Sequence, residues 1–378
     1  MSGEKVWLSR CGGYRPEELL AQVEEAFAAL GVWEELKPGM QVVLKPNLVI
    51  SAKPEAAIAT HPGLVAAVGR CVQKAGGQVI IAESPGGPYT PAAMKAVFRG
   101  CGYTEMAKEC GFTLYTDCKS REVSLPGAVR CRQLSVAEPF LTRDYLIDLA
   151  KLKTHGMVGF SGAVKNLFGA VPGLQKPELH CRFPEKQAFS EMLVDLCDFL
   201  KPDLCFTDGI LAMEGDGPTG GRPRRMGVLG ASKSPYALDV CMASLIGLEP
   251  EGVLMLKEAC RRGLGPISPA ECRLVKERIE PLAQPDFVKA RASSTDFIDR
   301  LPKILRPAAK RLATPTPKIR RAECVGCGRC AESCPQHTIQ IRDGKAVIDY
   351  KKCIRCFCCH EMCPKHVIDI RRWSLLHF

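Results

Sequence analysis

The chain has 378 residues, 46% of them hydrophobic, and a mean hydropathy of −0.03. This composition permits a sizeable core and excludes wholesale disorder and collagen-like repeats, and the length predicts two or three domains. No run approaches the roughly 18 uninterrupted apolar residues of a membrane span, so we expect no transmembrane segment. The N-terminal sequence lacks the apolar region of a secretory signal, which predicts a cytoplasmic location.

The positive charge is concentrated near the C-terminus. The net charge is +11, and residues 287–378 hold 19 Lys and Arg against 8 Asp and Glu, whereas residues 1–286 hold 33 of each kind. Such a basic segment favours docking of an acidic redox protein. We expect no nucleic-acid partner, because the segment has few aromatic residues for stacking and no recognition motif.

Short apolar runs alternate with helical patterns from residue 5 to about residue 265. This alternation predicts an α/β domain with a layered, largely parallel sheet and flanking helices. The expected strands cover 6–8, 41–45, 78–82, 112–115, 145–152, 203–206 and 226–229. The expected helices cover 16–30, 62–75, 183–200 and 235–246.

Residues 266–317 lose this regularity and contain eight prolines. We interpret them as a linker or wrapping arm with one or two short basic helices, such as 296–312, which prolines interrupt. The expected organisation is therefore an α/β domain at 1–265, this arm at 266–317 and a small domain at 318–378.

The last 60 residues contain a repeated cysteine motif. The run C-x2-C-x2-C-x3-C-P occurs twice, 29 residues apart. It resembles the run of bacterial two-cluster ferredoxins, in which the fourth cysteine of each run is a ligand of the other cluster. The resemblance implies a small α+β ferredoxin-like domain with two [4Fe-4S] clusters. The implied first set is Cys324, Cys327, Cys330 and Cys363, and the implied second set is Cys353, Cys356, Cys359 and Cys334.

Other readings of the cysteines are less compatible with the sequence. The chain has 21 cysteines, an odd number, and no secretory signal, which argues against a disulfide framework. Zinc knuckles also use four thiolates, but two proline-terminated runs in this order favour iron and sulfur. We interpret Cys358, inside the second run, as a packed thiol. Residues 338–348 alternate apolar and polar around Asp343 and Gly344, which predicts a hairpin.

Polar residues follow four of the expected strands. In an open parallel sheet, ligands bind beyond the carboxyl ends of the strands, so we expect these residues to converge at one edge. One of them, Glu83, precedes a Ser-Pro-Gly-Gly run, so it is as compatible with a role in a structural turn as with a role in the site. The residues are Lys45, Asn47, Glu83, Lys153, His155 and Asp208.

The segment 149–173 is the most informative of these. If its strand continues to His155, then Lys151, Lys153 and His155 share one face, because side chains alternate along a strand. The segment is also rich in glycine, which permits close approach of the backbone to a ligand.

The same segment continues into an expected short helix. Ser161 would cap this helix, which carries Lys165 and Asn166. Lysines, an imidazole and a helix N-terminus together predict a site for a carboxylate, a phosphate or an enolate. The alternative is an exposed strand end with solvated lysines.

Two further segments contain candidate functional residues. His61 begins the expected helix 62–75, either as a partial cap or as a ligand or base. Residues 208–221 contain G-x-G-x-x-G without the strand-to-helix context of a dinucleotide site. We expect a mobile acidic loop there, with Glu214 and Asp216 available to a cation or as acid and base groups.

The body resembles the family called domain of unknown function 362, whose members are often fused to a ferredoxin module. The resemblance implies this architecture rather than a substrate. Residues 155–165 are also similar to a segment of nickel-pincer lactate racemases, which implies a metal-ligand role for His155, although the doubled glycine of that segment is missing. The stretches that match the first family are 42–48, 60–62, 82–87, 151–173 and 213–221.

Three functions are compatible with these features. The first is a ferredoxin-coupled oxidoreductase that passes single electrons to a small anionic substrate or cofactor, with Lys151, Lys153 and Lys165 holding the anion and His155 donating a proton. The second is a non-catalytic electron-transfer or cofactor-assembly partner of another redox enzyme. The third is a metal-cofactor-dependent isomerase. The sequence leaves an additional organic cofactor and the oligomeric state open.

Overall fold

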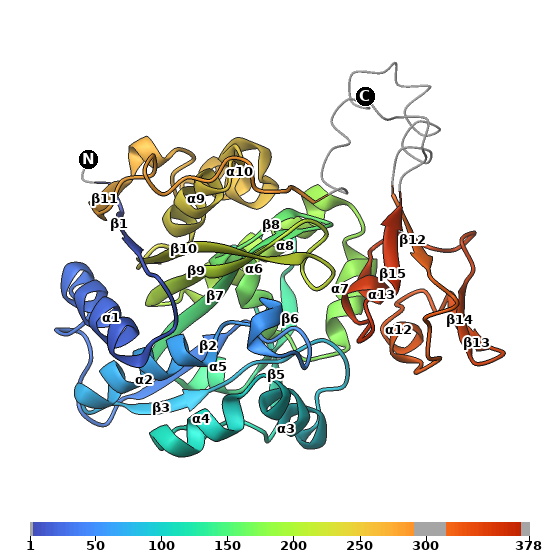
Figure 1. Cartoon of the computed structure of the whole chain (residues 1–378), viewed down its shortest axis with the longest axis horizontal. Coiled ribbons are helices and arrows are strands. Elements are labelled where there is room, and N and C mark those ends of the chain that lie inside the picture. Colours follow the sequence, from blue (N-terminus) through green and yellow to red (C-terminus); the bar gives the residue numbers. More distant parts are fainter. Residues whose placement is uncertain (1–2, 291–314, 372–378) are drawn as a thin grey trace.

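A nine-stranded sheet forms the centre of the molecule (Figure 1). The computed structural model describes residues 3–290 and 315–371. The strand order is β11-β1-β10-β9-β7-β2-β3-β4, with β8 beside β7. Five of the eight pairings among these described strands are parallel, so the prediction of a largely parallel sheet is confirmed. The strands are β1 (Lys5–Arg10), β2 (Gln41–Pro46), β3 (Gln78–Ile81), β4 (Thr113–Leu114), β7 (Tyr145–His155), β8 (Gly159–Ser161), β9 (Leu204–Glu214), β10 (Arg222–Ser232) and β11 (Arg273–Lys276).

Helices cover both faces of the sheet. Along β7, Ile147 and Leu149 pack on the face that α1–α4 cover, whereas Leu146 and Ala150 pack on the face that α5–α10 cover. A strand buried on both faces reads as a continuous apolar run. The helices of the first face are α1 (Pro16–Leu30), α2 (Pro62–Lys74), α3 (Pro91–Gly100) and α4 (Tyr103–Cys110). Those of the second face are α5 (Pro139–Thr142), α6 (Ala163–Asn166), α7 (Gln175–Arg182), α8 (Lys186–Leu200), α9 (Pro235–Leu245) and α10 (Leu254–Arg261).

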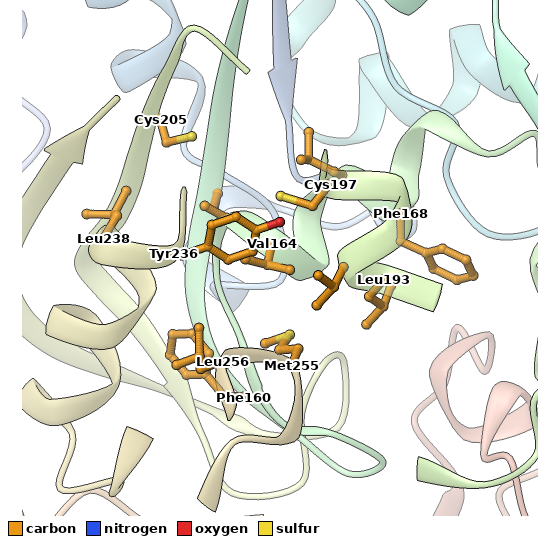
Figure 2. Packing of buried hydrophobic residues seen from close by; sticks show 14 of the residues in the cluster. Phe160, Val164, Phe168, Leu193, Cys197, Cys205, Tyr236, Leu238, Met255 and Leu256 are labelled. Atoms are coloured by element: carbon orange, nitrogen blue, oxygen red, sulfur yellow. The ribbon is translucent and has the colours of Figure 1, made fainter. Parts of the chain in front are cut away.

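The core of the second face surrounds the short helix α6. Figure 2 shows Val164 of α6 among side chains that come from α8, α9 and α10. Phe168, in the 3-10 helix η2 (Leu167–Ala170), lies at the side of this core, with its ring 5.4 Å from that of Phe189 of α8. The packing therefore fixes the segment that carries Lys165.

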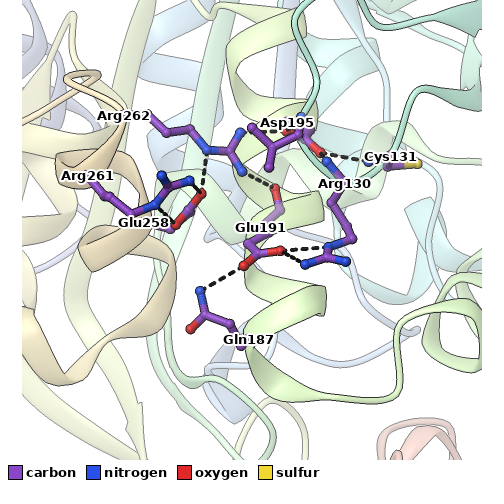
Figure 3. Close-up of polar contacts among 9 residues, drawn as sticks. Arg130, Cys131, Gln187, Glu191, Asp195, Glu258, Arg261 and Arg262 are labelled. Carbon is purple, nitrogen blue, oxygen red and sulfur yellow. Dashed lines mark hydrogen bonds and ion pairs between the residues drawn. The ribbon is translucent and has the colours of Figure 1, made fainter.

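A buried ionic network joins α8 to α10 (Figure 3). Asp195 of α8 accepts hydrogen bonds from the backbone N–H groups of Val129, Arg130 and Cys131 at 2.9, 2.8 and 2.8 Å, and it pairs with Arg262 at 2.5 Å. The loop that supplies these N–H groups joins the hairpin strands β5 (Ser120–Ser124) and β6 (Gln133–Ala137). Because each polar partner is satisfied, the network fixes this hairpin on the domain.

Most expected helix boundaries are confirmed. Helix α1 coincides with the expected 16–30, because Pro16 occupies its first turn and Gly31, with φ of 70°, ends it. Helix α8 begins at Lys186 instead of 183. The preceding helix α7 was not expected from the sequence, and Phe183 ends it by donating its N–H to the carbonyl of Leu179.

The prediction of a mobile loop over 208–221 is wrong. Residues 208–214 continue β9, and β10 begins at Arg222, so only 215–221 form the turn of an antiparallel hairpin. Glu214 is directly opposite Arg222 in the register. Opposite charges on facing residues stabilise such a pair of strands, and the acid and the arginine eight residues apart are the signal in the sequence for this hairpin.

The first half of the expected linker packs on the domain. Residues 273–276 form β11, which pairs in parallel with β1, and the N–H of Gly215 donates to the carbonyl of Val288 at 2.7 Å. Three short 3-10 helices also occur, η1 (Pro54–Ala56), η3 (Pro250–Gly252) and η4 (Pro269–Glu271). The basic helices expected at 296–312 lie outside the described residues.

The C-terminal module consists of two small hairpin-like sheets and two short helices. The predicted hairpin is confirmed as β13 (Ile339–Arg342) and β14 (Lys345–Ile348), joined by Asp343 and Gly344, both with positive φ. The other elements are β12 (Thr316–Ile319), which pairs with β15 (Ile368–Arg371), α12 (Arg329–Glu332) and α13 (Cys358–Glu361). None of the helices in the described ranges has the length and apolar character that a membrane span requires.

Candidate functional site

The eight motif cysteines line two separate cavities in the C-terminal module. One cavity, of about 360 Å³, is lined by the first set. The other, of about 330 Å³, is lined by the second set. Each cavity therefore gathers the four thiols that the sequence groups together, with the fourth contributed by the other run. Four thiolates around a space of this kind fit an iron–sulfur cluster. Within the described ranges, no three His, Cys, Asp or Glu side chains are arranged to hold a single metal ion.

A third cavity, which we call the central pocket, lies between the α/β domain and this module. It encloses about 730 Å³, part of it open to solvent. The domain contributes polar side chains from β7, β8, α6, α7 and the segments that follow β2 and β3, and the module contributes four residues around α12 and α13. The polar residues of the domain are Asn47, Glu83, Ser84, Lys153, His155, Ser161, Lys165, Asn166, Lys176 and His180, and the module contributes Ser333, Cys358, Glu361 and Met362.

Helix α13 attaches the module to the turn between β9 and β10. The ring Nε2 of His360 lies 3.1 Å from the carbonyl oxygen of Asp216, and the hydroxyl of Thr219 donates to the carbonyl of Glu361 at 3.1 Å. A Cβ added at Gly220 would lie 2.4 Å from the ring of His360. A glycine at this position thus permits the close approach of the two parts.

Apolar packing supports the same contact. Met362 is buried in a cluster with Ile50, Ile58 and Met213 of the domain. A Cβ at Gly86 would lie 2.2 Å from the sulfur of Met362. The module is therefore held against the domain by both polar and apolar contacts, and the central pocket is part of this interface.

His155 presents one nitrogen toward the module. Its Nδ1 accepts the backbone N–H of Met157 at 3.1 Å, and its Nε2, which makes no hydrogen bond, lies 3.4 Å from a carboxylate oxygen of Glu361. Burial, followed by the charge of Lys165, holds the pKa of His155 well below its ordinary value. The imidazole is therefore neutral near pH 7, and because Nδ1 is an acceptor, the proton is on Nε2.

The lysines of the pocket differ in the hydrogen-bond and ion-pair partners of their amines. Lys153 donates to the side-chain oxygen of Asn47 at 2.7 Å and to the carbonyl of Ile58 at 2.8 Å. Among the described residues, the Lys165 amine has no hydrogen-bond or ion-pair partner, and it lies 5.1 Å from the ring centroid of Phe168. Burial lowers the pKa of both lysines. The charge of Glu361 opposes the shift at Lys165 without pairing with the amine, and an amine that lacks a hydrogen-bonded partner in a cavity favours an anionic ligand.

Lys176 and the module residues were not found from the sequence. Lys176 of α7 donates to the carbonyl of Ser84 and to that of Val171, the latter at 2.6 Å, and so joins two loops that line the pocket. Burial lowers the pKa of Lys176 to about 7. Its position follows from a helix that the sequence did not reveal. The module residues reach the pocket only through the docking of α13, for which the sequence contains no local signal.

Other expected residues support the pocket from below. Lys45 forms a buried ion pair with Glu83 at 2.6 Å, so Glu83 is the lining residue and Lys45 neutralises it. Asn47 donates to Asn166 at 2.9 Å, and Asn166 donates to Asp148 at 2.8 Å. These hydrogen bonds link the end of β2 and the helix α6 to Asp148 of β7 and so fix the positions of the two asparagine side chains.

Ser161 does not cap α6. Gly162 occupies the cap position, and the Asp239 carboxylate of α9 accepts the N–H groups of Ala163 and Val164 at 2.6 and 3.0 Å. Burial raises the pKa of Asp239 to about 7, although the two N–H donors oppose this shift. The end of α6 is thus already occupied by an acid from the core, and Ser161 is a lining residue only.

Lys151, Asp208 and His61 form a separate group outside the central pocket. The Lys151 amine pairs with Asp208 at 2.8 Å, and Tyr14 donates to the same carboxylate at 2.7 Å. The ring of His61 stacks on that of Tyr14 with centroids 3.6 Å apart and lines another cavity, of about 490 Å³. The structure therefore divides the expected convergence at the sheet edge into two places.

Glu214 and Asp216 are also outside the pocket. Glu214 pairs with Arg222 at 2.7 Å and with Arg224 at 3.2 Å, and it accepts the N–H of Val288 at 2.9 Å. Asp216 lies in the turn, where its carbonyl contacts His360. The Glu214 carboxylate is thus already paired within and beside the hairpin, so the expectation that it is available to a cation is wrong.

Comparison with known proteins identifies both parts. The family described as "Domain of unknown function (DUF362)" matches residues 42–244, and "4Fe-4S dicluster domain" matches residues 316–364. A relative from Synechocystis sp., named "Thylakoid-associated protein sll1697", is 33% identical over 265 residues, which cover 70% of this chain and 81% of that protein. The chain belongs to the DUF362 family. The C-terminal module of this DUF362 protein is an iron–sulfur electron-transfer domain.

Two solved structures resemble part of this DUF362 chain. The lactate racemase apoprotein from Thermoanaerobacterium thermosaccharolyticum matches with a TM-score of 0.41 and 13% identity, over 65% of this chain and 57% of that chain. A protein from Thermotoga maritima matches with a TM-score of 0.35 and 11% identity, over 57% and 55%. The chain thus spans less than two thirds of the length of either structure.

Replacement of Gly220 by valine is expected to separate the module from the domain. The new side chain collides with the His360 ring, and overpacking of this kind costs about 1–3 kcal/mol. Hydrogen–deuterium exchange should therefore accelerate in the turn 215–221 and in α13. Gly252→Val is the matched control, because a Cβ at Gly252 meets nothing within 4 Å. Equal exchange in the two variants would show that α13 is not docked at this turn.

His61 provides a pH-dependent prediction. Burial lowers the pKa of His61 from 6.5 to about 4, so between these values the unfolded chain binds a proton that the native chain excludes. Stability therefore rises with pH across this window and falls on acidification. His61→Asn keeps an acceptor for the Gly63 N–H and removes the titration. Between pH 6.5 and 5, the unfolding free energy of this variant should fall by about 1.5 kcal/mol less than that of the wild type, as measured by urea unfolding. An identical decrease in both proteins would contradict the assignment.

Proposed function

We propose that this DUF362 protein transfers single electrons from its C-terminal module to an anionic molecule bound in the central pocket. The observation that carries the proposal is the shared wall of that pocket. Lys165 and His155 of the domain line it together with Cys358, which lies between Cys356 and Cys359 of the second set. A molecule in the pocket is therefore next to a segment that carries motif cysteines.

We infer that the module holds two [4Fe-4S] clusters, one in each cysteine-lined cavity. The two cavities and their four thiols each support this inference. Clusters of this type supply one electron at a time. Ser333, next to Cys334, also lines the central pocket, so the second set is the one whose flanking residues reach the pocket from both runs.

The domain residues would bind and orient the acceptor. Lys165 has no partner among the described residues, so its amine is available to an oxyanion. His155 offers the Nε2–H group of a neutral ring, which suits hydrogen bonding to a carbonyl or carboxylate oxygen without transfer of the proton. Lys153 is fixed by Asn47 and Ile58 and adds positive potential behind them. A reducible carboxylic acid, an acyl thioester or a bound anionic redox cofactor fits these groups.

The cluster assignment predicts different effects of substitutions at two cysteines of the module. Cys334→Ser removes a ligand of the second set and should lower the iron content by about half. Cys358→Ser removes a thiol that is not a ligand and should leave both iron and sulfide unchanged. Iron analysis and electron paramagnetic resonance after anaerobic reconstitution test this pair. Stoichiometric zinc in place of iron in the wild-type protein would contradict the proposal.

The pocket assignment is tested by reoxidation of the reduced protein. The module is reduced anaerobically, and its visible absorbance is followed after mixing with reducible carboxylic acids and acyl thioesters. The double variant Lys165→Gln/His155→Gln should slow reoxidation by the effective acceptor at least about tenfold, because both groups that contact the oxyanion are lost. Lys257→Gln, an exposed lysine of α10, is the control. Equal rates in the double variant and the control would contradict a role for the pocket.

A further inference from the structure

The end of the module that carries the first cysteine set is open to solvent. Of the eight motif cysteines, all of them within the described residues, Cys327 alone is exposed. Two large apolar residues on the same cavity wall are also exposed, Val325 by 58% and Ile341 by 40%. The second set, by contrast, has flanking residues from both runs, Ser333 and Cys358, in the central pocket, whereas the first set reaches that pocket only through Met362, next to Cys363. The module therefore has one end toward the domain and one toward solvent.

Basic side chains surround these exposed apolar residues. Lys365 lines the same cavity. The exposed Arg329 and Arg342 directly follow the lining residues Gly328 and Ile341. Lys345 donates to the carbonyl of Cys324 at 2.6 Å, which places its amine at the same wall. A small apolar centre with a charged rim is the usual composition of a transient protein interface.

The acidic residues of the module do not cancel this charge. Residues 315–371 contain 11 Lys and Arg and 6 Asp and Glu. Glu323 and Asp369 both pair with Arg320, and Glu361 lies in the central pocket. Glu332 and Asp343 remain exposed near the basic rim, so the potential of this end is positive but moderate.

We propose that this end of the module, which we call the outer face and define by Val325, Cys327, Ile341, Arg342 and Lys365, docks a small acidic electron-carrier protein. In each encounter the carrier loses one electron and the module gains it. The positive rim attracts the acidic carrier, and the apolar centre excludes water at the contact. The onward path of the electron rests on the function proposed above, whereas the docking itself does not.

Stopped-flow reduction of the full, cluster-containing chain tests the outer face. Anaerobic reduced flavodoxin, an acidic carrier, is mixed with the oxidised protein, and the loss of visible absorbance is followed at increasing salt. The rate should fall as ionic strength rises. The charge-reversal variant Arg342→Glu/Lys365→Glu should react about tenfold more slowly at low salt and lose most of this salt dependence. Its reduction by dithionite and its electron paramagnetic resonance spectrum should match those of the wild type.

The control makes the same change in net charge elsewhere. Lys95→Glu/Lys108→Glu alters exposed lysines on α3 and α4 of the domain and should retain the wild-type rate. Equal rates in the two double variants would overturn the proposal. It would also be overturned if the outer-face variant lost binding to phosphatidylserine vesicles while its reduction by flavodoxin was unchanged, since the face would then serve a membrane.

Failure of this inference is distinguishable from failure of the proposed function. The pocket variant Lys165→Gln/His155→Gln leaves the outer face intact, so flavodoxin should reduce it at the wild-type rate even if its reoxidation is impaired. Slow reduction of this pocket variant by flavodoxin would contradict the separation of the two ends.

Discussion

The contact between α13 and the turn that joins β9 to β10 determines the geometry of the whole molecule. This short helix carries cysteines of the module, and its last residue, Glu361, together with the following Met362 completes the wall of the central pocket. The contact depends on Gly220, where any side chain would meet the His360 ring. A single close approach of the turn backbone to a side chain of α13 therefore brings the cysteine-lined cavities and the polar pocket together.

The electrostatics of the domain follow from where its buried cations find partners. Lys45 and Lys151 each lie within 2.8 Å of a carboxylate, and these pairs are structural. Lys165 is only partly buried and has no such carboxylate partner at ion-pair distance among the described residues, and desolvation of an unpaired amine is costly. A protein retains such a group when a ligand compensates it, which is why the pocket, and not the ion pairs nearby, is the place where we propose that chemistry occurs.

The sequence was a good guide wherever a signal is local. Pro16 and Gly31 mark the ends of α1, alternation around Asp343-Gly344 marks the module's hairpin, and the cysteine spacing groups the thiols that line each cavity. It failed over 208–221, where glycines and acids resemble a loop but the cross-strand pairing of Glu214 with Arg222 extends the hairpin. Strand pairing is an interaction between two segments, so the sequence of one strand alone does not reveal the partner that extends it.

The sequence by itself determined the layered α/β domain, the iron–sulfur module and the residues 153–165 as a polar segment, because periodicity, turn residues and ligand spacing are written in neighbouring residues. Only the tertiary structure decided which polar residues share a site. It assigned Lys151, Asp208 and His61 to one place, assigned Lys165 and His155 to another, and added Lys176 and Glu361 to the latter. The reason is physical: which side chains meet depends on strand order and on the docking of the module, and both are set by contacts between residues far apart in the chain.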